Sequence, residues 1–122
     1  MSINDRFKSM ITDELVAAFE RICLEQYEAI LGGKNQKYNR LFDEVMIIRD
    51  ELKARGERQV LLPLLSHKNR QVRYQAAMAT LLVSPASAKQ ALEKLSHSHE
   101  FPQAADASIA LDKLADGSFV PS

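Results

Sequence analysis

Three histidines and one glutamate are the residues of this chain whose types and spacing come nearest to a metal site. His97, His99 and Glu100 occur within four positions, and His67 stands at a similar Ser-His pair upstream. Two histidines two positions apart could chelate an ion from a loop, but catalytic zinc needs three well-placed ligands and outer hydrogen bonds that orient them. Short polar turns between helices also favour serine and histidine. We therefore predict no metal and no cofactor, and keep a small enzyme built on these residues as a third alternative.

The other reactive side chains also favour a protein without catalytic residues. Cys23 lies on the apolar side of a helical pattern and is expected to be a small core residue rather than a nucleophile. The adjacent acids at 13–14, 43–44 and 50–51 point in different directions on a helix and cannot converge on one substrate. No phosphate loop, nucleophile elbow or dinucleotide fingerprint occurs. The chain is predicted not to be an enzyme.

Positive charge is concentrated between Lys53 and Arg73, where six basic residues stand against Glu57 alone. Such a patch could steer an acidic protein partner or, as a weaker alternative, phosphate. The competing interpretation is a solvated surface on which Arg73 is paired internally. The residues predicted to contact a partner are Arg58, Lys68, Arg70, Arg73 and Tyr74.

Composition excludes several classes of protein. The 122 residues predict a single domain over 1–122, and 16 Lys+Arg balance 16 Asp+Glu, which argues against a dedicated nucleic-acid protein and a polybasic membrane patch. One cysteine allows no internal disulfide, and the apolar runs are too short to span a membrane. The first residues lack the basic and apolar regions of a signal peptide, so a cytoplasmic protein is expected.

The elements that must position these residues are all helical by their period. Apolar residues recur every three or four positions over 12–31, with Thr12 as the expected N-cap and Gly32-Gly33 as the stop. After a loop at 34–37, a second helix is expected from Tyr38 to Gly56, which gives an antiparallel hairpin over 12–56.

Shorter helices follow this hairpin. They are expected at 60–65, interrupted by Pro63, then at 71–83 and 86–95, and from Pro102 to Gly117, before a tail at 118–122. No alternating pattern lasts long enough to predict a strand. The predicted fold class is all-α.

A shift of 30 positions aligns part of the C-terminal half with itself. Leu-x-x-Leu-Ser-His occurs at 62–67 and again at 92–97, and the same register matches Ala77 with Ala107 and Leu81 with Leu111. A fixed period in this range is typical of solenoids, in which helix pairs stack to bury their apolar faces. Chance matching in a chain rich in Leu and Ala is the alternative.

The run from Leu61 to Ala77 resembles a HEAT-type repeat, with a Leu-rich first helix, a polar turn, Val72-Arg73 and a pair of small residues. The second copy departs from this pattern, because Pro102-Gln103 stands where Val-Arg is expected, and His67 replaces the common turn Asp. The whole chain is similar to a group of short bacterial proteins with HEAT-like helices. The resemblance implies a short right-handed α-α superhelix, with the N-terminal hairpin followed by two HEAT-like pairs over 57–117, and it implies no activity.

We therefore expect a non-enzymatic protein-protein interaction module that binds through the second-helix face and the basic junction of this solenoid. The alternatives are a nucleic-acid-associated HEAT-like protein and a toxin-neutralising immunity protein. Self-association is left open, because Leu92, Leu95 and Leu111 would lie near an uncovered end of the stack.

Overall fold

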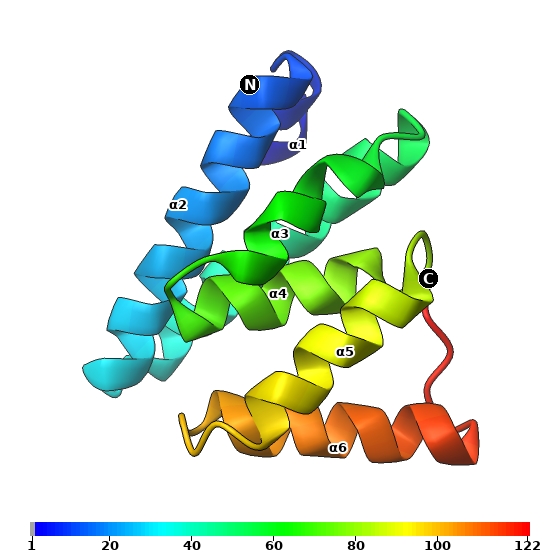
Figure 1. Cartoon of the computed structure of the whole chain (residues 1–122). Coiled ribbons are helices and arrows are strands. Elements are labelled where there is room, and N and C mark those ends of the chain that lie inside the picture. Colours follow the sequence, from blue (N-terminus) through cyan, green and yellow to red (C-terminus); the bar gives the residue numbers. More distant parts are fainter. Residues whose placement is uncertain (1) are drawn as a thin grey trace. The chain divides into compact units, whose positions relative to one another are not determined.

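A computed structural model of the chain describes residues 2–122, which form six α-helices, one 3-10 helix and no strand (Figure 1). The predicted all-α class is confirmed. The chain divides into two compact units, one ending at Val60 and the other running from Leu61 to Ser122. This boundary lies close to the predicted change from hairpin to repeats.

The first unit is a helical hairpin with an additional short helix. α2 (Thr12–Leu31) packs against α3 (Asn35–Ala54), and α1 (Ile3–Lys8) packs on α3. The sequence prediction missed α1, which starts with a capping box between Ser2 and Asp5. The apolar period proposed for the hairpin does form its core. The fully buried side chains include Phe7, Leu15, Phe19, Ile22, Leu41, Ile48 and Leu52.

The ends of the hairpin helices differ in detail from the prediction. The N-cap of α2 is Ile11, whose N–H donates to the Glu14 carboxylate at 3.0 Å. The Thr12 hydroxyl instead donates to the Glu57 carboxylate at 2.8 Å. Gly33 does stop α2 with a φ of 66°, but α3 begins directly after Lys34, so the predicted loop at 34–37 is mostly helix.

The second unit holds the short helices. η1 (Arg58–Ser66) begins in the first unit and ends in the second, and it is a 3-10 helix that contains Pro63. Proline lacks the N–H that an α-helical turn would need at this position. The η1 helix is followed by α4 (Arg70–Thr80), α5 (Pro85–Ser96) and α6 (Gln103–Asp116). Of these, α5 packs against both α4 and α6.

The 30-residue register falls on similar positions of the second unit in part, whereas Leu62 and Leu81 differ in burial from their matches Leu92 and Leu111. η1 ends at Ser66 and α5 ends at Ser96, while Ala77 of α4 and Ala107 of α6 are both buried. The core of this unit also contains Leu81, Ala88, Leu92 and Leu95, and Phe119 from the C-terminal tail packs against it. Leu92 and Leu95 are therefore interior residues, which removes them from the surface that was expected to allow self-association.

Candidate partner-binding site

Arg58 is the most deeply buried of the five residues predicted to contact a partner. Its side chain is 2% exposed, and its Nε donates to the Arg49 carbonyl oxygen at 3.0 Å. A terminal nitrogen lies 3.6 Å from the Asp50 carboxylate. Burial lowers the pKa of Arg58, against the effect of the Asp50 charge, which raises it. These contacts give Arg58 a role within the first unit and leave almost none of its surface for a partner.

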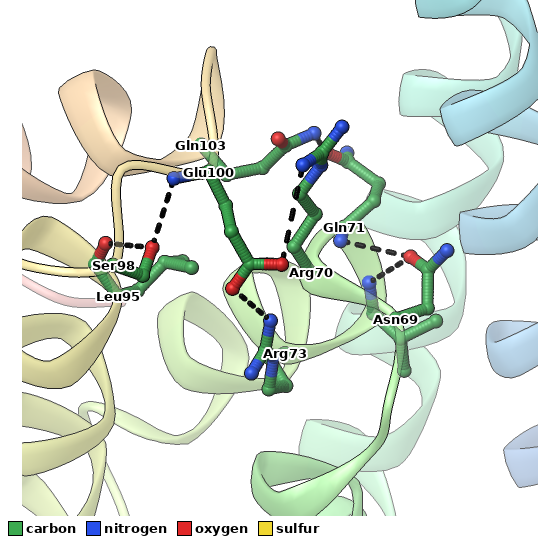
Figure 2. A network of polar contacts seen from close by, with 9 residues as sticks. Asn69, Arg70, Gln71, Arg73, Leu95, Ser98, Glu100 and Gln103 are labelled. Carbon is green, nitrogen blue, oxygen red and sulfur yellow. Dashed lines mark hydrogen bonds and ion pairs between the residues drawn. The ribbon is translucent and has the colours of Figure 1, made fainter.

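Arg70 and Arg73 form a cluster with Glu100, a residue that the sequence analysis had considered for a metal site. The Arg73 Nη2 atom lies 2.8 Å from one Glu100 oxygen, and the Arg70 Nη1 atom lies 3.9 Å from the other. Figure 2 shows the Glu100 carboxylate between the two guanidinium groups. The internal pairing considered for Arg73 is therefore present, and one carboxylate neutralises part of the charge of both arginines.

Hydrogen bonds around this cluster hold the start of α4 beside the start of α6, which directly follows the loop that carries Glu100. The Asn69 side-chain oxygen accepts from the N–H groups of Gln71 and Val72, at 2.8 and 3.2 Å. The Gln103 amide donates to the Gln71 side-chain oxygen at 2.8 Å, and both side chains are buried (Figure 2). These contacts position the Arg–Glu cluster, because they fix the two chain segments that carry it.

Lys68 and Tyr74 remain the accessible members of the predicted set. Lys68 lies in the turn between η1 and α4 and is exposed. Tyr74 is half-buried on α4 and packs at the edge of the core of the second unit. Of the four basic residues predicted to contact a partner, only Lys68 is thus exposed, and Arg70 and Arg73 close to it in the sequence are paired with Glu100.

Tyr74 lines a groove of about 310 Å³ between α4, α6 and the C-terminal tail. Its apolar lining comes from Tyr74, Met78, Ile109, Ala110 and Phe119, and its polar lining from Asp106, Lys113 and Ser118. The tail closes one side because Gly117 adopts a φ of 80° and the Phe119 N–H donates to the Lys113 carbonyl oxygen. The sequence analysis identified only Tyr74 here. The sequence signal that could have indicated this groove is Ile109, an apolar residue outside the main apolar stripe of α6. Ile109 is 52% exposed.

Asp106 has an unusual position in this groove. It lies in the first turn of α6, and burial raises its pKa. Within residues 2–122 its carboxylate makes no hydrogen bond and no ion pair. Near the other end of α6, hydrogen bonding from Ser118 lowers the pKa of Asp116, and the Lys113 charge adds a smaller effect in the same direction.

The groups considered for metal and thiol chemistry are not brought together. His97 directly follows α5 as its C-cap and His99 is exposed, while the His67 Nδ1 atom accepts from the Asn69 N–H. In the described part of the chain, no three His, Cys, Asp or Glu side chains are placed to share a metal ion. Cys23 is fully buried, and burial raises the pKa of its thiol far above the usual range, with Glu20 adding to the effect.

Comparison with known proteins places this arrangement in a family. The pattern of DUF2019, described as a domain of unknown function, matches residues 13–115. The chain belongs to the DUF2019 family. The matched region contains the Arg–Glu cluster and Asp106, whereas Ser118 and Phe119 of the groove lie beyond its end.

A crystal structure supports the fold of this DUF2019 chain. The protein RPA1889 from Rhodopseudomonas palustris CGA009 is 46% identical to it, with a TM-score of 0.91 over 94% of this chain and 97% of that one. None of the curated proteins compared with the chain matches it. Over residues 2–122, no helix is both long and apolar enough to span a bilayer. The relatives therefore establish family and fold and carry no activity over to this protein.

Proposed function

We propose that this protein is a non-enzymatic, cytoplasmic binding module that takes a segment of a partner protein into the groove between α4 and α6. The observation that carries this proposal is the partly open, mainly apolar lining of the groove by Tyr74, Met78, Ile109 and Phe119. A concave surface with apolar anchors and a few polar groups is typical of peptide-binding sites.

We interpret α4 and α6 as the second helices of two HEAT-like pairs. The 30-residue register and the equivalent buried alanines, Ala77 and Ala107, support this interpretation. Solenoids of this kind bind partners along the surface formed by successive helices. The second-helix face proposed from the sequence is then the groove, and the basic junction contributes less than expected because Arg58, Arg70 and Arg73 are engaged internally.

Capture from a nuclease-treated lysate of the source organism tests the proposal. We expect a stoichiometric protein to be retained by the natural chain and by Val83→Ser, and to be lost with Ile109→Ser. Val83 and Ile109 are both about half exposed, but only Ile109 lines the groove. Loss of a central apolar anchor is expected to weaken binding about tenfold or more.

Titration calorimetry with the purified partner then separates groove binding from other surfaces. Equal affinity of the Ile109→Ser and natural chains would contradict the groove as the binding site. In the same assay, Lys68→Glu tests the remaining positive charge, because Lys68 is exposed and its replacement leaves the Arg–Glu cluster intact. The identity of the captured protein decides whether the partner is a toxin, as the immunity-protein alternative requires.

A further inference from the structure

Asp106 gives the groove a chemical preference that its apolar lining alone would not have. The carboxylate is partly removed from water among Tyr74, Ile109 and Ala110, and no side chain in the described residues donates to it or pairs with it. A desolvated carboxylate without a partner is unfavourable, whereas one that meets a cation recovers part of that cost. Asp106 lies in the first turn of α6, where the helix dipole favours a carboxylate, and this effect offsets part of the cost without supplying a bonded partner.

Lys113 does not provide the missing positive charge. It lines the same groove, seven positions after Asp106 on α6, so about two helical turns separate the two residues. In the described residues no ion pair joins Lys113 to Asp106, and Lys113 also has a small effect on the pKa of Asp116, which is lowered mainly by hydrogen bonding from Ser118. The groove is therefore lined by one carboxylate, Asp106, and by one ammonium group, Lys113, about two helical turns farther along α6.

We infer that the groove binds an arginine or lysine side chain of the partner protein, with the apolar stem along Tyr74 and Ile109 and the cationic group at Asp106. Long basic side chains bury their methylene groups on apolar surfaces while the charged end reaches a polar group. A guanidinium group can also stack on the Tyr74 ring. The groove has a volume of about 310 Å³, which is at the low end for ligand pockets. This volume suits one or two side chains rather than a large molecule.

This inference rests on the proposed function, because it names the partner chemistry of the same groove. NMR titration of the full chain tests it with three small probes, the N-acetyl N′-methylamides of arginine, norleucine and glutamate. Norleucine has a similar apolar stem without the charge. We expect the arginine probe to shift the amide resonances of Tyr74, Asp106 and Ile109. It should bind about three- to tenfold more tightly than the norleucine probe, and the glutamate probe should bind most weakly.

Asp106→Asn should remove the advantage of arginine over norleucine while leaving norleucine binding unchanged. Asp112→Asn is the matched control, since Asp112 is an exposed acid on the same helix and does not line the groove. Norleucine binding as tightly as arginine, or equal losses in the two variants, would overturn the inference and leave the apolar groove standing. If none of the three probes shifts groove resonances, the inference and the groove of the proposed function both fail.

Discussion

At the scale of single residues, the arginines show how pairing changes the meaning of a basic segment. Arg70 and Arg73 share the Glu100 carboxylate, and Arg58 is buried against the Arg49 carbonyl oxygen. Arginine is suited to such internal pairing because its planar group presents several donors at fixed angles. Asp106 is the opposite case, a charge without a partner in the described residues. The accessible charge of the second unit therefore differs from the charge counted along its sequence.

Asp106 should affect stability in a pH-dependent manner. Because folding raises its pKa, the folded chain holds this proton more tightly than the unfolded chain, and the ionised form costs stability above the folded-state pKa. We expect Asp106→Asn to raise the melting temperature by about 1–2 °C at neutral pH, a small effect because the group is partly solvated. The difference should vanish as the pH falls to about 3, where aspartate is protonated in both states.

Thermal denaturation followed by circular dichroism between those two pH values measures this difference. Asp112→Asn serves as the control on the same helix. A destabilised Asp106→Asn chain at neutral pH would show that the carboxylate makes a favourable interaction, contrary to its position in the structure.

At the scale of elements, local signals determined where several helices stop, and side-chain contacts determined where others start. Gly33 and Gly117 end α2 and α6 with positive φ, as predicted. The predicted start of α2 is one residue too late. The Thr12 hydroxyl donates to Glu57, 45 positions away, instead of capping its own helix. A contact over that separation has no signature in the local sequence.

Asn69 is the element-scale residue with the clearest expected effect. Its side chain accepts from two N–H groups at the start of α4, so Asn69→Ala should lower the free energy of unfolding by about 1 kcal/mol. Urea denaturation measures the change. Asn69→Asp keeps both acceptor positions and should retain most of the stability, and an Asp variant as unstable as the Ala variant would contradict this account of the cap.

At the scale of the whole molecule, net charge and its pairing bear on the nucleic-acid alternative. The formal net charge is zero, and Arg70 and Arg73 of α4 are ion-paired with Glu100. Phosphate binding depends on cations that can displace the counterions of DNA. Both basic residues of α4, Arg70 and Arg73, are paired with Glu100, so Lys68 in the preceding turn is the nearest basic residue that has no acidic partner within residues 2–122.

We therefore expect fluorescence anisotropy with a labelled DNA duplex to show binding weaker than the about 1–100 µM Kd of non-specific DNA-binding proteins. An affinity for the duplex within that range would favour the nucleic-acid alternative over the protein-binding module, provided that it falls steeply with salt and is lost in the Lys68→Glu chain. A Val83→Ser chain, altered outside the basic segment, is the control for non-specific loss.

The sequence by itself determined the helical class, most helix spans, the hairpin and the 30-residue register, because each depends on spacing between neighbours within a few turns. Only the tertiary structure decided which charges are accessible and where a groove forms on the second unit. Glu100 reaches Arg73 across 27 positions, and the groove joins Tyr74, Asp106 and Phe119 from three segments. Such contacts arise from how helices pack, and packing depends on the surfaces of several elements at once.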